Sequence, residues 1–327
     1  MKLSRFQAIL GLILAAVLSA PAWGSNTDTR AAIPGTVNYV EGQASIGNQT
    51  ISSNDIGSAQ LEADQSLSTE NGKAEILLTP GVFLRLGNNS AVRMISPSIT
   101  TTELAVNQGA AMLEVTQLYP QNDIRISTGG ATTRIEKTGL YAFDASQYQI
   151  RVFDGKAQVQ YEDHNVTVKG GHELALNNTS KLKAQGFDKK QYEDSDLYRF
   201  SSLRSSYLAE ANAQSARVYV ANGWYRPGWI GAGWYWNPWF RTFTFIPANG
   251  FLYSPFGWGF YSPLVAYRAP IFVTGFHHFG PGFRAPVVVG HRGFFGRPAG
   301  RPFHAPSRGF VRSAPGGGFH RGFPHHR

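Results

Sequence analysis

The fold of this chain is decided by the stretch Gly72-Lys73-Ala74-Glu75-Ile76-Leu77-Leu78-Thr79-Pro80-Gly81-Val82-Phe83-Leu84-Arg85-Leu86. Apolar residues occupy every second position on both sides of a turn, namely Ala74, Ile76 and Leu78 before it and Val82, Leu84 and Leu86 after it. Side chains of a β-strand alternate between its two faces, so each run gains one buried face. The glycine at the corner supplies positive φ. We predict two strands joined by a tight turn.

The same alternation recurs along residues 34–178, at Val37 and Tyr39, Ala111, Leu113 and Val115, Ile124 and Ile126, Tyr141 and Phe143, Ile150 and Val152, Ala157, Val159 and Tyr161, Val166 and Val168, and Leu174 and Leu176. Turn residues separate these runs, at Glu70-Asn71-Gly72, Gly87-Asn88-Asn89, Gly129-Gly130, Asp154-Gly155 and Gly170-Gly171. Short strands without intervening helices predict an all-β domain. A solenoid-like stack of short strands and a flattened β-sandwich both fit this spacing.

Several short motifs in this region resemble a FecR-type domain, in matching order and spacing over residues 33–178: Gly35-Thr36-Val37-Asn38-Tyr39-Val40-Glu41-Gly42, Gln65 to Ile76, Ser127-Thr128, Lys137 to Tyr141, Val152 to Val159, and Gly170-Gly171 with Leu174. The resemblance implies a β fold, an extracytoplasmic location and a binding or scaffolding role. The best-known members of that family relay an outer-membrane signal to a cytoplasmic sigma factor. We expect this chain to lack their cytoplasmic N-terminal part.

The first 24 residues have the composition of a secretory signal peptide. Lys2 and Arg5 precede an uncharged apolar stretch from Phe6 to Leu18, and small residues before Ser25 suggest cleavage there. The alternative is a retained membrane anchor, although a span needs roughly 20 apolar residues. The chain has no cysteine, which excludes disulfides, thiol catalysis and thiolate zinc sites. We expect an exported protein in the periplasm, at the cell surface or secreted.

Four regions are predicted after the signal peptide. Residues 25–186 form the FecR-like β domain, and 187–216 form a connector helix, because apolar residues there recur near a helical period. That helix either packs on the β domain or docks a partner. Residues 217–275 are aromatic and rich in Gly and Pro, a composition that does not favour a conventional core, and 276–327 form a disordered basic tail.

Within the aromatic segment one hairpin is predicted, in which Phe243 and Phe245 pair with Leu252 and Tyr253 across the turn Ala248-Asn249-Gly250. Asn-Gly between alternating apolar residues is a strong hairpin signal.

Charge divides the chain at Glu210. All 21 Asp and Glu lie at or before this residue, and the last 117 residues carry 12 Arg and no Lys. A segment of that sign attracts polyanions such as acidic polysaccharide or lipid head groups. The predicted contact residues, arginines and aromatic rings of this segment, are Arg292, Phe294, Arg308, Phe310, Arg321, Phe323, Trp234, Trp236 and Trp239.

Other ligands compete for the same segment. Its Arg-Gly-Phe elements resemble segments that bind single-stranded nucleic acid, but export would remove the chain from that ligand. Seven histidines, such as His277-His278 and His325-His326, could collect a metal ion, although a disordered chain provides converging ligands only loosely. Self-association through arginine and aromatic contacts is the plainest alternative. We therefore predict neither a metal site nor a cofactor.

An enzyme is not expected. The sequence has no Gly-x-Ser-x-Gly, no phosphate loop and no His-Glu-x-x-His. His164 and His172 are the histidines of the β domain, and both lie near turn ends. The predicted function is a non-enzymatic exported FecR-domain protein that binds or scaffolds at the cell envelope through its basic aromatic tail. The alternative is an extracytoplasmic signalling component that binds a partner protein through the FecR-like domain.

Overall fold

The computed structural model describes residues 31–177, 182–221 and 231–270. The signal peptide, the cleavage site and the predicted disordered tail lie outside these residues. The large sheet consists of β1 Val37–Ile46, β2 Gln49–Ile51, β3 Ser66–Leu77, β4 Val82–Leu86, β5 Ala91–Pro97, β6 Thr101–Gln108, β7 Ala110–Val115, β8 Asp123–Thr128, β9 Ala131–Ile135, β10 Gly139–Asp144, β11 Gln149–Asp154, β12 Lys156–Tyr161, β13 His164–Lys169, β14 His172–Ala175 and β15 Gln185–Gly186.

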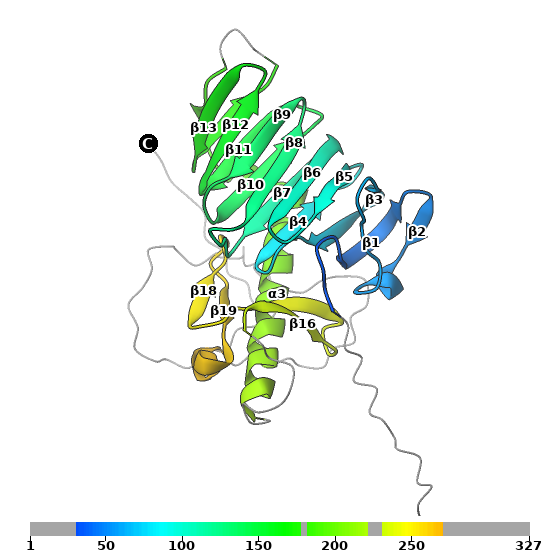
Figure 1. The fold of residues 1–327 in the computed structure, drawn as a ribbon, viewed down its shortest axis with the longest axis vertical. Coiled ribbons are helices and arrows are strands. Elements are labelled where there is room, and N and C mark those ends of the chain that lie inside the picture. Colours follow the sequence, from blue (N-terminus) through cyan, green and yellow to red (C-terminus); the bar gives the residue numbers. More distant parts are fainter. Residues whose placement is uncertain (1–30, 178–181, 222–230, 271–327) are drawn as a thin grey trace, which may run out of the picture. The chain divides into compact units, whose positions relative to one another are not determined.

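These strands form one sheet that folds back on itself at β3. The order along the sheet is β13-β12-β9-β8-β6-β5-β3-β4-β7-β10-β11-β14-β15, and β1 pairs with β2 and β3. The start of β3, from Ser66, pairs with β5, and its end, up to Leu77, pairs with β4. Strand β3 thus passes from one layer to the other, and of the strands labelled in Figure 1, β4, β7, β10 and β11 belong to one layer and β5, β6, β8, β9, β12 and β13 to the other.

The space between the two layers holds the main core. Alternating residues predicted to face inward are fully buried there, among them Ile76, Leu84, Leu113, Ile126 and Val159. Neighbouring strands of the described sheet are antiparallel except for β6 and β8, which run parallel. The all-β prediction is confirmed, and of its two alternatives the structure has the flattened sandwich.

One turn glycine shows why the corners need this residue. Gly155 has φ of 100°, and a side-chain carbon there would lie 2.2 Å from the hydroxyl oxygen of Tyr141. The fully buried Tyr141 donates that hydroxyl to the carbonyl of Lys137 and accepts the backbone N–H of Lys156. The glycine therefore leaves room for the hydrogen bonds that join three neighbouring segments.

Two helices follow the sandwich, α2 Lys190–Glu193 and α3 Asp196–Ala221. Among the described residues no helix is both long and apolar enough to cross a membrane. Helix α3 buries an unusual number of polar side chains, including Ser201, Arg204, Ser205 and Asn212. They are buried because α3 lies between the outer face of the sheet and the residues that follow it (Figure 1).

Two hairpins complete the described chain. Strand β16 (Gly233–Asn237) pairs with β17 (Thr242–Ile246), β18 (Phe251–Tyr253) pairs with β19 (Gly259–Tyr261), and the short helix η3 spans Pro263–Arg268. The predicted pairing of β17 residues with Leu252 and Tyr253 is therefore wrong. The reason is local, because the side chain of Asn237 accepts the backbone N–H groups of Trp239 and Phe240 and closes a turn that pairs β17 with the preceding strand β16.

These hairpins build a second core on the outside of the sandwich, which corrects the expectation that residues 217–275 lack one. Phe243, Phe245 and Phe260 are fully buried, together with Leu77 and Phe83 from the outward face of the sheet. Gly and Pro leave the segment too little apolar surface to form a core alone. It forms one because the sheet and α3 supply the missing apolar surface.

Candidate functional site

A network of buried charges lies between the sheet and α3. Arg85 of β4 contacts the carboxylates of Glu75 and Glu114 at 2.7 and 2.6 Å, and all three side chains are fully buried. Arg204 of α3 reaches Glu75 at 2.8 Å, and the hydroxyl of Ser205 donates to Glu114 at 2.9 Å. Each buried carboxylate therefore faces at least one guanidinium, as buried charges require.

The network keeps the carboxylate of Glu75 charged. Burial alone would raise the pKa of Glu75, but the guanidinium groups of Arg204 and Arg85 outweigh it and lower that pKa from 4.5 to about 2. Burial would lower the pKa of Arg85, and the carboxylates of Glu114 and Glu75 raise it instead. The ion pairs of Glu75 with Arg85 and Arg204 therefore join the sheet to α3, and its carboxylate is not free to accept a proton.

Three buried asparagines attach the hairpins to the rest of the protein. Asn38 of β1 accepts the backbone N–H of Phe243 at 2.8 Å and donates to its carbonyl at 3.0 Å, as a neighbouring strand would. Asn212 of α3 holds Tyr261 in the same way, at 2.7 and 3.0 Å. Asn237 of β16 donates to the carbonyl of Ala211 in α3. The hairpins are thus fixed to both β1 and α3.

Glu210, the last acidic residue of the chain, is the buried carboxylate that this network leaves out. It is 4% exposed, and its Oε1 has no hydrogen-bond partner among the described residues. Burial raises its pKa above the ordinary 4.5. The folded state therefore holds the Glu210 proton more tightly than the unfolded state does. Its contribution to stability is complete below pH 4.5 and is lost as pH rises through the raised pKa.

Replacing Glu210 by glutamine should therefore stabilise the protein at neutral and higher pH and leave it unchanged in acid. We expect the melting temperature of Glu210→Gln to exceed that of wild type by about 2–4 °C at neutral pH. Thermal unfolding followed by circular dichroism between pH 4 and 8 measures the difference. Glu70→Gln, at an exposed position, is the matched control. An offset between Glu210→Gln and wild type that does not vary with pH would contradict this account.

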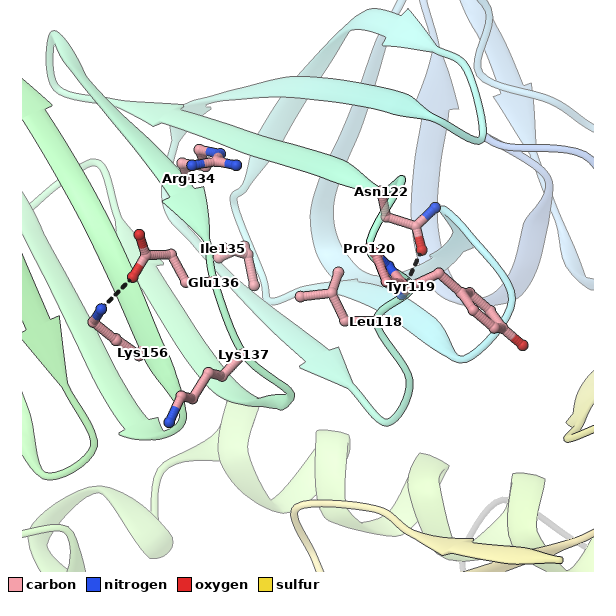
Figure 2. Close-up of a pocket in the computed structure, with 9 residues that line it drawn as sticks. All are labelled: Leu118, Tyr119, Pro120, Asn122, Arg134, Ile135, Glu136, Lys137 and Lys156. Carbon is pink, nitrogen blue, oxygen red and sulfur yellow. Dashed lines mark hydrogen bonds and ion pairs between the residues drawn. The ribbon is translucent and has the colours of Figure 1, made fainter. Parts of the chain in front are cut away.

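A surface pocket of about 460 Å³ opens beside the loop between β7 and β8, and its lining residues are Leu118, Tyr119, Pro120, Asn122, Arg134, Ile135, Glu136, Lys137 and Lys156. Figure 2 shows Leu118 and Ile135 between the Glu136–Lys156 ion pair and the loop that carries Asn122. The lining includes three cations and one carboxylate, a net positive charge that would suit an anionic ligand. However, Lys156 is paired with Glu136 at 2.8 Å and Arg134 with Asp123 at 3.2 Å. The existing pairs weaken the case for an anion site.

The predicted contact residues differ in their surroundings in the structure. The ring of Trp234 packs edge-on against Phe83, 4.9 Å between centroids, and Trp236 packs edge-on against Phe243 at 5.1 Å. Trp239 lies at the hairpin turn and is 76% exposed. Of the remaining predicted contacts, Arg292, Phe294, Arg308, Phe310, Arg321 and Phe323 lie outside the described residues.

The other candidate residues are placed as follows. His164 and His172 are both exposed at the ends of their strands, and His172 Nδ1 lies 3.2 Å from the carbonyl of Gly170. Within the described ranges no three His, Asp or Glu side chains gather as a metal site would require. The contact prediction did not include the exposed rings of Phe251 and Tyr253 on β18. Their alternation with Leu252 is the signal that could have found them.

These features define a mostly antiparallel β-sandwich with an accessory layer of one long helix and two hairpins. A family model described as FecR protein matches residues 65–158 of the chain. The match confirms the predicted resemblance over these residues, which run from the fold-back strand β3 into β12. No curated protein sequence matches the chain.

Two similar solved structures are crystal structures of a "putative anti-sigma factor" from Parabacteroides distasonis. One has a TM-score of 0.35 and 15% sequence identity, covering 40% of this chain and 64% of that chain. The other has a TM-score of 0.33 and 15% identity, covering 38% and 60%. The alignments thus span under two thirds of the length of those proteins.

Proposed function

We propose that the protein is a non-enzymatic, exported FecR-domain protein that binds or scaffolds at the cell envelope. In this proposal the sandwich and its accessory layer form a rigid base, and the arginine-rich residues 271–327 bind envelope or matrix polyanions. The observation that carries it is the segregation of charge, because every Asp and Glu precedes the arginines of the tail. The non-enzymatic part is supported by the pairing of Glu75 and Glu114 with Arg85.

The distribution of charge along the chain indicates that the ligand is negatively charged. Residues 25–216 carry 16 Lys and Arg against 21 Asp and Glu, whereas residues 217–327 carry 12 Arg against none. A segment of positive charge without internal anions attracts a polyanion along its whole length. Arginine also forms bidentate hydrogen bonds with carboxylate and phosphate groups.

The accessory layer supports the scaffolding part of the proposal. Residues 231–270 are joined to β1 and α3 by buried hydrogen bonds from Asn38, Asn212 and Asn237. The arginines after residue 270 therefore follow a segment that is fixed to the FecR-type sandwich. A polyanion bound by them is linked to that sandwich through a folded segment.

Neutralising the tail should remove the interaction. We expect the affinity of the full chain for an acidic polysaccharide to fall at least about tenfold at low salt, because attraction by clustered charges is the sum of many screened contacts. Elution from immobilised polygalacturonate on a salt gradient measures the change. The variant replaces by glutamine Arg284, Arg292, Arg297, Arg301, Arg308, Arg312, Arg321 and Arg327.

The matched control replaces the same eight arginines by lysine and should keep most of the retention. Equal retention of wild type and the glutamine variant would overturn the proposal. Substitution is preferable to deletion from residue 217, because α3 continues to Ala221 and residues 231–270 complete the second core. A shortened chain would lose folded structure together with its charge.

A second candidate function follows from the FecR match, namely an extracytoplasmic signalling component that binds a partner protein through the sandwich. Residues 65–158 carry the match and lie wholly within the sandwich. Co-purification of one stoichiometric partner with the glutamine variant would favour this candidate, because that variant keeps the sandwich and lacks the tail charge.

A further inference from the structure

The outer face of the second hairpin presents aromatic rings. Phe251 and Tyr253 lie on the same face of β18, and Tyr261 of β19 pairs with Phe251 across the hairpin and so shares that face. Phe251 is 40% exposed and Tyr253 is 60% exposed. The opposite face carries Phe260, which is fully buried in the second core. The hairpin, labelled β18 and β19 in Figure 1, thus buries one face and leaves an aromatic one open.

We call Phe251, Tyr253 and Tyr261 the aromatic platform. The rings of Phe251 and Tyr261 lie 6.1 Å apart and are inclined by only 30°, while Tyr253 stands at 80° to Phe251 at 5.4 Å. A side-chain carbon on Gly259 would meet the hydroxyl of Tyr261 at 2.7 Å and its ring at 2.8 Å. The Tyr261 ring therefore lies over the bare backbone of Gly259, in space that any other residue would fill.

The platform is held in place before any ligand binds. The fully buried side chain of Asn212 accepts the backbone N–H of Tyr261 at 2.7 Å and donates to its carbonyl at 3.0 Å. The same amide donates to the carbonyl of Phe245 at 2.8 Å, which links the hairpin to its neighbour. Rings on such a fixed backbone lose little conformational entropy on binding, so more of the contact energy appears as affinity.

Two arginines, Arg217 of α3 and Arg268 of η3, lie on elements that pack against β19 of the platform. Arg217 opposes the rise that burial causes in the pKa of the Tyr261 hydroxyl, while one nitrogen of its guanidinium donates to the backbone carbonyls of Ala269 and Pro270. Arg268 is exposed beside the platform's strand β19, in the short helix η3, where its Nε donates to the hydroxyl of Tyr267 at 3.0 Å. No Asp or Glu follows Glu210 in the sequence. A ligand here should combine an apolar face with negative charge.

We infer that the aromatic platform binds the sugar rings of an acidic polysaccharide. The apolar face of a sugar ring would lie on Phe251 and Tyr261 against the wall formed by Tyr253, and arginines would face its carboxylates. Three side chains offer far less than the roughly 800 Å² that each partner buries in a specific protein interface, but they suffice for one or two sugar rings. The inference rests on the proposed envelope-binding function and adds a site distinct from residues 271–327.

Titration of the full chain with oligogalacturonate by isothermal calorimetry tests the inference. Phe251→Ser and Tyr253→Ser should each weaken binding by about tenfold, the upper range for a single aromatic contact. Both positions are exposed, so the fold should survive. Gly259→Ala keeps every ring but displaces that of Tyr261, and should weaken binding as well. The control is Tyr148→Ser, because Tyr148 is 52% exposed, a value between those of Phe251 and Tyr253, yet lies in the turn between β10 and β11 of the sandwich.

Unchanged affinity in both serine variants would overturn the inference, as would an equal loss in Tyr148→Ser, no binding by wild type, or binding of acidic proteins but no oligosaccharide. The result separates the platform from the tail. If only the eight-arginine glutamine variant loses binding, the tail proposal stands and the platform inference is wrong. If only the platform variants lose binding, the platform inference stands and the tail proposal is wrong. Repeating the titration at about 0.5 M salt screens the arginines and leaves the stacking contribution.

Discussion

Replacing Arg85 by methionine is expected to destabilise the protein by about 3–5 kcal/mol, the usual cost of breaking a buried ion pair from one side. Arg85 lies between Glu75 and Glu114 at 2.7 and 2.6 Å, with no exposed surface on any of the three side chains. Methionine fills similar volume but leaves Glu114 without an opposite charge. Glu75 keeps Arg204 at 2.8 Å. Urea unfolding of Arg85→Met and wild type measures the loss.

A double variant separates charge from packing in this prediction. Arg85→Met with Glu114→Gln removes one charge of each sign and leaves the Glu75–Arg204 pair, so it should be more stable than Arg85→Met alone. The unfolding of wild type and both variants is compared at pH 7. The lowered pKa of Glu75 gives a contribution to stability that is present above 4.5 and is lost as pH falls toward 2. A loss below about 1 kcal/mol in Arg85→Met would mean that the network contributes little.

Alternation in the sequence was enough to predict the sandwich but not what covers it. The predicted inward residues of β3 and β4, such as Ile76 and Leu84, are fully buried, as expected for one face of each strand. The same pattern assigns Glu75 and Arg85 to the solvent face, yet all five residues of β4 are buried. Alternation with a period of two shows which side chains share one face of a strand. It does not show whether a second layer covers the opposite face. Here that layer is formed by α3 and the hairpins, more than one hundred residues further along the chain.

The sequence indicates which residue types occur after residue 217, but not which of their side chains face solvent. The sequence predicts aromatic contact residues after residue 217; of those described, Trp239 is exposed, and the structure adds exposed rings that were not predicted, Phe251 and Tyr253 on the second hairpin. Trp234 and Trp236 were assigned to contacts, but they pack on Phe83 and Phe243. Which ring faces outward depends on strand register, and that register follows from a turn closed by the side chain of Asn237. Register of this kind is not visible in composition.

The second large effect is expected for Phe245→Ala, which should destabilise the whole described unit by about 3–5 kcal/mol. Phe245 is fully buried, its ring lies 5.9 Å from that of Phe260, and its carbonyl accepts a hydrogen bond from Asn212 of α3. Removing the ring leaves a cavity bordered by the sheet, the helix and both hairpins. Urea unfolding of Phe245→Ala and wild type, followed by circular dichroism and by tryptophan fluorescence, measures the loss of stability.

The two probes make the prediction specific, because they report on different parts of the molecule. Circular dichroism follows mainly the sandwich and α3, whereas tryptophan fluorescence follows mainly the hairpins, which carry four of the seven tryptophans, Trp234, Trp236, Trp239 and Trp258. If the second core joins these parts into one cooperative unit, both transitions shift together in Phe245→Ala. Trp239→Ala, at an exposed turn position, should shift neither. A fluorescence transition that moves alone would show that the hairpins unfold independently of the sandwich, and that they cannot serve as a rigid link to the arginine-rich tail.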